Sequence, residues 1–223
     1  MQQKLVAVMG RPRSGKDSFV DLARKAIALL RPDLTTGEAS SIDCVRHMLA
    51  NAGLDMSAKT PTDRNTLAGI GHMLEEGYNF PTNSVMKVLG RGPGSWNADY
   101  EPPDVLFVQV REHWLVDKWA RLLADRAYAK RISREGLVDL PARVVRLLVR
   151  TDADYRPVGN ASDDSDDLDN PLKYDRVVAN DMTWPGLFEK AHDFARWITL
   201  PPGPEQPKTG PNTIGDRLRR ALR

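Results

Sequence analysis

The sequence has little of what marks a secreted or membrane protein. Its 223 residues include one cysteine, Cys44, which excludes an internal disulfide and a cysteine-based zinc site and is typical of a cytoplasmic protein. No apolar run approaches the roughly 18 residues that a membrane span needs. The apolar segment near the N-terminus lacks the pattern of a signal peptide. We therefore expect a cytoplasmic protein without a membrane partner.

The chain also carries little net charge, +2 at pH 7, and this total gives only a faint indication of a nucleic-acid partner. The charges are unevenly distributed instead. Basic residues gather at 121–156 and in the last turns of the chain, and an acidic block at 163–169 lies between them. With 41% hydrophobic and 28% charged residues, a chain of this length fits one soluble α/β domain rather than two.

A phosphate-binding motif stands close to the start of the chain. The apolar run at 5–9 predicts a buried strand, and a helical pattern begins near Lys16. Between Gly10 and Lys16 the spacing is G-x-x-x-x-G-K, in which glycines let backbone N–H groups turn toward a phosphate and the helix N-terminus faces the anion. Lys16 is then expected to reach the β- and γ-phosphates of ATP. We predict a nucleotide site formed by Gly10, Arg11, Pro12, Arg13, Ser14, Gly15, Lys16, Asp17 and Ser18.

One position of this motif departs from its usual form. Asp17 stands where the Mg²⁺-binding Ser or Thr is expected, and the hydroxyl follows one residue later as Ser18. The string from Arg13 to Ser18, Arg-Ser-Gly-Lys-Asp-Ser, resembles the loop of the phage deoxynucleoside monophosphate kinases, and animal phosphomevalonate kinases carry a similar Lys-Asp loop. We predict that Asp17 and Ser18 form the metal side of the site. Asp17 would hold Mg²⁺ directly or through water, or would accept the acceptor's proton.

Two further stretches resemble the same kinases. One is Ser-x-Asp-x-x-Lys, found here at 41–46 with Arg46 in place of the lysine, and the other is Lys-Thr-x-x-Asp-Arg at 59–64. The resemblance implies that these helical stretches form the acceptor side of the cleft and that Arg46 and Arg64 hold a phosphate, for which a planar guanidinium is well shaped. The alternatives are solvated arginines and ordinary helix caps. The predicted substrate-binding residues are Ser41, Asp43, Arg46, Asp63, Arg64 and Arg111.

The remaining pattern alternates helices and apolar strands. Strands are expected at 104–110, 144–149 and 174–179, and helices at 18–30, 36–50, 59–74, 114–129 and 184–198. Arg111 and Arg150 follow two of the strands, at the carboxyl ends where ligands bind in such sheets. Arg150 is the best placed of four arginines that could stabilise charge on the transferring group, the others being Arg13, Arg111 and Arg156. Asn180 follows the last strand, a position that in small nucleotide kinases lies beside the adenine.

Three segments do not fit the alternation. Residues 90–103 read as a long Gly- and Pro-rich loop, in which Trp96 and Tyr100 either stack on a base or pin the loop to the domain. Residues 151–170 are polar and acidic and read as a lid or excursion. Beyond a kinase domain at 1–200, a Pro-rich linker and basic tail occupy 201–223.

These observations predict a three-layer α/β P-loop NTPase fold of the nucleotide-kinase kind, with a mainly parallel sheet. The D-x-x-G switch of GTPases is missing after the apolar strands. We predict transfer of the γ-phosphoryl group of ATP, with Mg²⁺ as cofactor and with Lys16, Asp17 and Arg150 as catalytic residues.

The acceptor has two alternatives within the enzyme class. A branch of the family, in phages with hypermodified thymine, phosphorylates the 5-hydroxymethyl group of 5-hydroxymethyl-deoxyuridine in DNA, whereas the family at large phosphorylates free deoxynucleoside monophosphates. Clustered basic residues favour a DNA substrate, since DNA needs an extended cationic surface. The third alternative is a non-catalytic nucleotide-binding module. The basic residues in question are Arg121, Arg126, Lys130, Arg131, Arg134, Arg143, Arg146, Arg217, Arg219, Arg220 and Arg223.

Overall fold

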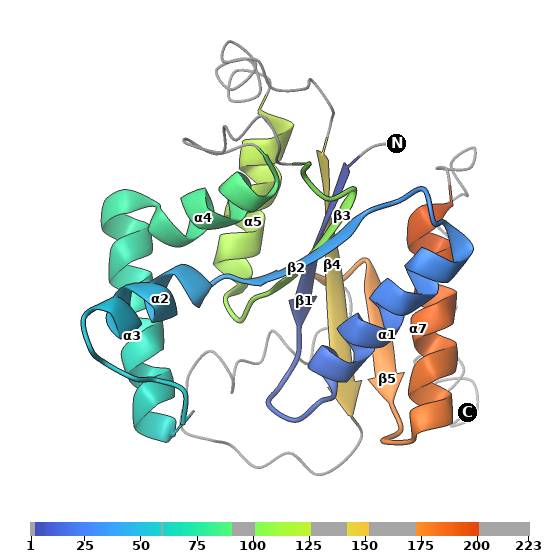
Figure 1. The fold of residues 1–223 in the computed structure, drawn as a ribbon, viewed down its shortest axis with the longest axis horizontal. Helices are drawn as coiled ribbons and strands as arrows, with labels where there is room; N and C mark the ends of the chain where they lie inside the picture. The colour runs from blue at the N-terminus through green and yellow to red at the C-terminus, as the bar shows by residue number, and fades with distance from the viewer. Residues whose placement is uncertain (1–2, 59, 91–100, 126–141, 152–172, 201–223) are drawn as a thin grey trace, which may run out of the picture.

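The computed structural model describes residues 3–58, 60–90, 101–125, 142–151 and 173–200. Helices and strands alternate along most of this length (Figure 1). The strands are β1 (Gln3–Met9), β2 (Thr36–Ser40), β3 (Val105–Gln109), β4 (Ala142–Thr151) and β5 (Arg176–Asn180). The helices are α1 (Lys16–Leu30), α2 (Asp43–Asn51), α3 (Pro61–Tyr78), α4 (Phe80–Val88), α5 (His113–Ala124) and α7 (Trp184–Thr199).

The five strands form one sheet in the order β2-β3-β1-β4-β5, and every neighbouring pair is parallel. β1 lies at the centre, and all seven of its residues are buried. Its apolar run is continuous because a parallel strand is covered by helices on both faces. The predicted α/β fold with a mainly parallel sheet is confirmed.

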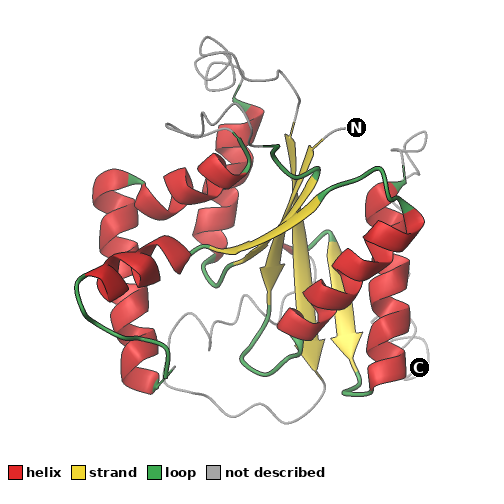
Figure 2. Cartoon of the chain, viewed as in Figure 1, coloured by secondary structure: helices red, strands yellow, loops and turns green. Residues whose placement is uncertain are grey.

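Helices cover both faces of the sheet, which gives three layers (Figures 1 and 2). Successive side chains of β1 point to opposite faces, as in any strand. Val6 and Val8 pack with residues of α1 and α7, including Phe19 and Phe194. On the other face, the neighbouring β1 side chains pack with residues of α4 and α5, including the fully buried Trp119.

The chain leaves neighbouring strands toward opposite faces of the sheet. After β1 it enters α1 on one face, and after β3 it enters α5 on the other. In open parallel sheets, such a switch point opens a crevice at the carboxyl ends of the strands, where ligands bind. The connections of this sheet therefore predict a ligand crevice between the end of β1 and the end of β3.

A small separate core joins α2 to α3. Val45, Leu49 and Leu67 are buried together there, away from the two faces of the sheet. This helical pair stands beside the sheet on the side of β2 (Figure 1). Residues of α3 line a pocket beside the turn that follows β3.

Two elements differ from the sequence-based expectation. The stretch 36–50 was expected to enter one helix from a short polar segment, but Thr36–Ser40 forms the edge strand β2, whose side chains are only partly covered. A half-exposed edge strand needs no apolar run, so its sequence, TGEAS, carries no strand signal. Helix α4 was not expected either, since its nine residues are too few to show a clear helical period.

The other elements occur where they were expected, with ends displaced by a few residues. Helix α3 continues to Tyr78, four residues beyond the expected end. Most of the long loop, with Trp96 and Tyr100, lies outside the described residues, as do nearly all of the expected lid and the C-terminal tail. Within the described ranges, no helix is both long enough and apolar enough to cross a membrane.

Candidate nucleotide and acceptor site

The loop between β1 and α1 has the conformation of a phosphate cradle. Gly10, Arg13 and Gly15 all have positive φ, at 150°, 62° and 82°. The Ser14 N–H donates to the Arg11 carbonyl at 3.2 Å, which closes a turn within the loop. The Lys16 ammonium also donates to the Arg11 carbonyl, at 3.2 Å. Lys16 is therefore folded back over the loop, where a bound phosphate would meet it.

Both glycines of the motif are required by close contacts. A Cβ on Gly10 would lie 2.2 Å from the Val149 carbonyl oxygen, which belongs to β4. A Cβ on Gly15 would lie 2.3 Å from Nδ2 of Asn180, the last residue of β5. The loop is thus pressed against the carboxyl ends of two strands. Only a residue without a side chain fits at either position.

The loop also contains a polar group that suits an anion. Ser14 is fully buried, and its Oγ has no hydrogen-bond partner among the described residues. A buried hydroxyl without a partner is costly, and a phosphate oxygen would satisfy it. Gly15 at the N-cap of α1 offers no side-chain cap to the first turn. The first N–H groups of α1 point toward the helix N-terminus, where they can bind an anion.

The predicted metal side lies in the first turn of α1. Asp17 is exposed and Ser18 is partly exposed, so both can reach a ligand. Across the ranges that the structure describes, no cluster of three or more His, Cys, Asp or Glu side chains could hold a metal ion. Mg²⁺ usually takes few protein ligands and is held largely by substrate phosphates and water. The residues present therefore fit an ion that arrives with a nucleotide.

Arg150 lies at the carboxyl edge of the sheet, where β4 pairs with the end of β5 in the register Arg150↔Ala179. Its Nε is buried and has no hydrogen-bond partner among the described residues. The preceding residue on the strand, Val149, is the one whose carbonyl lies against Gly10. Arg150 thus follows the strand residue that contacts the loop, and its Nε is available as a donor. Arg156, the other arginine after this strand, lies outside the described residues.

Asn180 does not face open space. It is 3% exposed, and its Nδ2 donates to the Ser14 carbonyl at 3.0 Å. Its Oδ1 accepts from the Met182 N–H at 2.9 Å. The side chain expected beside the adenine is thus bonded to the phosphate-binding loop.

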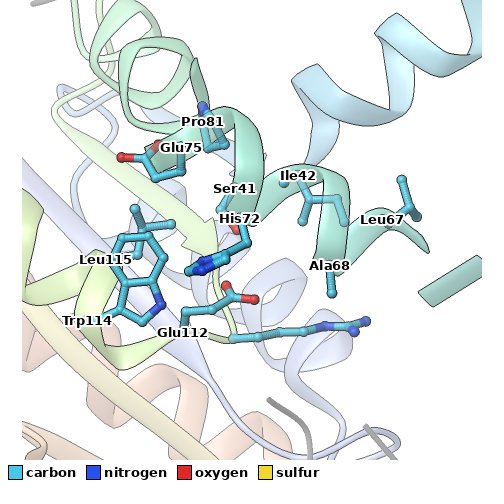
Figure 3. Close-up of a pocket in the computed structure, with 12 residues that line it drawn as sticks. Ser41, Ile42, Leu67, Ala68, His72, Glu75, Pro81, Glu112, Trp114 and Leu115 are labelled. Carbon is cyan, nitrogen blue, oxygen red and sulfur yellow. The ribbon is translucent and has the colours of Figure 1, made fainter. Parts of the chain in front are cut away.

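A pocket opens on the other side of the crevice, between α3, the start of α4 and the turn from β3 into α5 (Figure 3). Its empty volume is about 430 Å³, part of which is open to solvent. Two of the predicted substrate residues, Ser41 and Arg111, line it. The rings of His72 and Trp114 meet edge to face, with centroids 5.6 Å apart. The pocket thus offers an aromatic wall and several polar groups.

The other four predicted substrate residues do not line this pocket. Asp43 accepts from the Ser40 N–H at 2.9 Å and forms an ion pair with Arg46 at 2.7 Å, so both serve the start of α2. Asp63 completes a capping box with Thr60 at the start of α3. For Asp63, helix capping accounts for the sequence pattern, and Arg64 follows it in the first turn of α3.

Sequence reasoning missed a buried polar network behind the pocket. Glu75, which lines the pocket, is 2% exposed and accepts from the N–H and the hydroxyl of Thr82, at 2.8 and 2.6 Å. Lys118 donates to the same carboxylate. The Trp119 indole donates to the Thr82 hydroxyl at 3.0 Å. Glu75 gave no signal because in sequence it is one of two adjacent acids on an amphipathic helix.

The basic residues proposed for DNA binding are only partly described. Arg121 lies on the last turn of α5, and Arg143 lies near the start of β4, both at the amino ends of the strands and away from the loop. Arg146 lies midway along β4, opposite Ala7 of β1. Arg146 pairs with Asp117 at 2.8 Å. The other members of the set lie outside the described residues.

Comparisons with known proteins add little to this geometry. No protein-family model matches the sequence, and no curated protein matches it. Among solved structures, two of an APS kinase from Mycobacterium tuberculosis are similar, one a cysteine-to-alanine mutant and one in complex with AMPPNP and APS. Each is 16% identical and covers 89% of this chain and 99% of its own, with TM-scores of 0.37 and 0.38. Similarity this weak does not bear on what this chain binds.

The chain's own topology defines its class. A five-stranded parallel sheet carries helices on both faces, and the G-x-x-x-x-G-K loop joins the carboxyl end of the central strand to a helix. This is the α/β P-loop arrangement predicted from the sequence.

Proposed function

We propose that this protein is an ATP-dependent kinase that phosphorylates the 5-hydroxymethyl group of 5-hydroxymethyl-deoxyuridine in DNA, a step of thymidine hypermodification. The observation that carries the kinase assignment is the loop at 10–16. Its glycines are forced by contacts with β4 and β5, Lys16 folds over it, and a buried Ser14 hydroxyl lacks a partner among the described residues. Each of these features suits the phosphates of ATP.

The residues of this chain would act by positioning and by neutralising charge, since phosphoryl transfer needs little covalent chemistry from the protein. Lys16 and the N-terminus of α1 would hold the β- and γ-phosphates. The Nε of Arg150, which is buried and lacks a partner among the described residues, would donate to the group in transfer. Asp17 would accept the proton of the acceptor hydroxyl or hold Mg²⁺, which when bound offsets phosphate charge.

The pocket beside α3 and α5 would take the acceptor base. It is lined by the Trp114 ring and by the polar groups of Ser41, Arg111 and Glu112. A base in duplex DNA would have to leave the helix to enter it, and a flipped base is commonly read by stacking and by edge hydrogen bonds. Trp114, which is 39% exposed, offers such a stacking surface, and Arg111 offers donors. The identity of the base rests on the resemblance to the phage kinases.

A free deoxynucleoside monophosphate is the second candidate acceptor, and one observation favours it. Of the described members of the basic set, Arg121 and Arg143 lie at the amino ends of the strands, away from the loop, and Arg146 lies midway along β4 in an ion pair with Asp117. They would not contact a DNA strand whose base occupies the pocket. A mononucleotide needs only the pocket and a phosphate contact, for which Arg111 is present.

A label-transfer assay separates these possibilities. Protein is incubated with γ-labelled ATP and Mg²⁺ and, in parallel, 5-hydroxymethyluracil DNA, ordinary DNA or each free deoxynucleoside monophosphate. Label on the modified DNA alone supports the proposed function. Label on the mononucleotides alone establishes the second candidate. ATP binding without transfer to any acceptor would leave a non-catalytic nucleotide-binding module and refute the kinase proposal.

A further inference from the structure

We infer that Asn180 is a positioning residue that sets the shape of the phosphate-binding loop and does not contact the nucleotide base. Its Nδ2 donates to the Ser14 carbonyl across 3.0 Å. The two residues are 166 positions apart in sequence, and both are buried. The inference rests on the proposed function only in taking this loop to bind phosphate.

The orientation of the Asn180 amide is fixed by two bonds of opposite sense. Its Nδ2 faces an acceptor, the Ser14 carbonyl, while its Oδ1 faces a donor, the Met182 N–H, at 2.9 Å. Turning the amide over would set oxygen against oxygen and nitrogen against N–H, and both bonds would be lost. The strand end therefore always presents a donor to the loop.

This donor controls the peptide bond between Ser14 and Gly15. The peptide is trans, and in a planar trans peptide the C=O and the N–H point in opposite directions. Because the Ser14 carbonyl turns toward Asn180, the Gly15 N–H must point away from β5. An anion at the N-terminus of α1 would meet that N–H together with the first N–H groups of the helix.

Without this contact, the peptide would have little reason to keep its orientation. Gly15 adopts φ of 82°, but glycine populates both signs of φ with similar ease. A turned-over peptide would present its carbonyl oxygen to the phosphate in place of an N–H, which repels the anion. The close approach of Asn180 leaves no room for a Cβ at Gly15. Gly15 and Asn180 therefore act together to fix the orientation of this peptide.

The test uses three substitutions in the full-length protein, with the MgATP dissociation constant measured by titration calorimetry. Asn180→Ala removes the donor, and Asn180→Asp replaces it with an acceptor of the same shape. Asn83→Asp is the matched control, because the Asn83 amide also donates to a backbone carbonyl, that of Tyr78 at 3.3 Å, at the start of α4. At about pH 8, both Asn180 variants are expected to bind MgATP about tenfold or more weakly, and the control to bind as wild type does.

A pH series on Asn180→Asp tells positioning apart from general damage. Burial raises the pKa of a carboxyl group, while Arg13 and Lys16 on the loop oppose this and the adjacent Asp181 adds to it. Once protonated, the carboxyl can donate to the Ser14 carbonyl again. Relative to wild type at the same pH, MgATP affinity of this variant should recover toward about pH 5, and that of Asn180→Ala should not.

Each result decides the matter. Wild-type affinity in both Asn180 variants would overturn the inference while leaving the proposed function intact, and so would equal losses in Asn83→Asp. Absence of MgATP binding by the wild-type protein would refute the proposed function itself. If the aspartate variant does not fold, Asn180→Ala still decides, because it introduces no charge.

Discussion

Replacing Gly15 by alanine tests the geometry of the loop most sharply. The new Cβ would lie 2.3 Å from Asn180 Nδ2, at a φ of 82°. A non-glycine residue in the left-handed region costs roughly 1–2 kcal/mol. Relieving the clash requires the Asn180 side chain to move, which breaks its bond to the Ser14 carbonyl, worth about 0.5–1.5 kcal/mol. We therefore expect Gly15→Ala to lower the free energy of unfolding by about 1.5–3.5 kcal/mol.

A double-mutant cycle checks the reasoning behind that magnitude. In an Asn180→Ala background, the Gly15→Ala clash is already gone, so only the backbone strain remains. The double variant should therefore lose about 1 kcal/mol less stability than the sum of the two single losses. Gly10→Ala serves as the contrast, because its Cβ would meet the Val149 carbonyl, 2.2 Å away. A backbone oxygen is not removed by Asn180→Ala, so that pair should be additive.

The stability assay is urea unfolding of each variant, with Gly69→Ala as a control of opposite sign. Gly69 is exposed within α3, and a Cβ there meets nothing within 4 Å. Alanine should stabilise that helix by about 0.5–1 kcal/mol. A Gly15→Ala protein as stable as wild type, or full additivity with Asn180→Ala, would refute the contact between the loop and β5.

Four further outcomes are expected. Lys16→Ala should lower turnover by about 10²-fold or more, because the ammonium would stabilise charge on the transferred phosphate, and its melting curve should match that of wild type. Asp17→Asn should lower turnover at saturating Mg²⁺. If only the melting temperature changes, Asp17 stabilises the N-terminus of α1 through the helix dipole and has no catalytic role. Thr82→Val should destabilise the protein by about 1–3 kcal/mol in urea, because the buried Glu75 carboxylate loses the bond from the Thr82 hydroxyl and the Trp119 indole loses its acceptor, while Thr82→Ser should restore both bonds. Burial, and then the nearby arginines, lower the pKa of Lys4 in the folded protein. Between this lowered pKa and the ordinary lysine pKa, the unfolded chain binds more protons than the folded one, so the free energy of unfolding should rise with pH in that range. A Lys4→Met variant should not show this rise.

The central part of the fold could be predicted from sequence because its signals are local. Buried parallel strands such as β1 and β3 are continuous apolar runs, and the phosphate-binding loop has a fixed spacing of glycine and lysine. β2 could not be predicted in this way. It is held at the sheet edge by backbone pairing with β3 and by contacts such as the Gln109 amide to Glu38 at 3.1 Å, which join residues far apart in sequence.

The site was predictable to the same limited depth. The pattern of glycines locates the loop, but nothing in the sequence shows that Asn180 bonds to it. Asp63 of the second acceptor block carries the same pattern that a helix cap requires, and Asp43 of the first block bonds to its neighbours Ser40 and Arg46. Glu75 reads as a surface acid because its partners come from α4 and α5. Side-chain partners that are distant in sequence leave no mark in periodicity or spacing.

The most direct measurement of the central claim is calorimetric titration of the wild-type protein with MgATP and, separately, with AMP. If the loop at 10–16 holds the β- and γ-phosphates, MgATP should bind at least about tenfold more tightly than AMP, a difference of about 1.4 kcal/mol, and Lys16→Ala should remove most of that preference. Equal affinity for the two nucleotides, or a preference for MgATP that survives Lys16→Ala unchanged, would contradict the assignment of this loop as a nucleotide site.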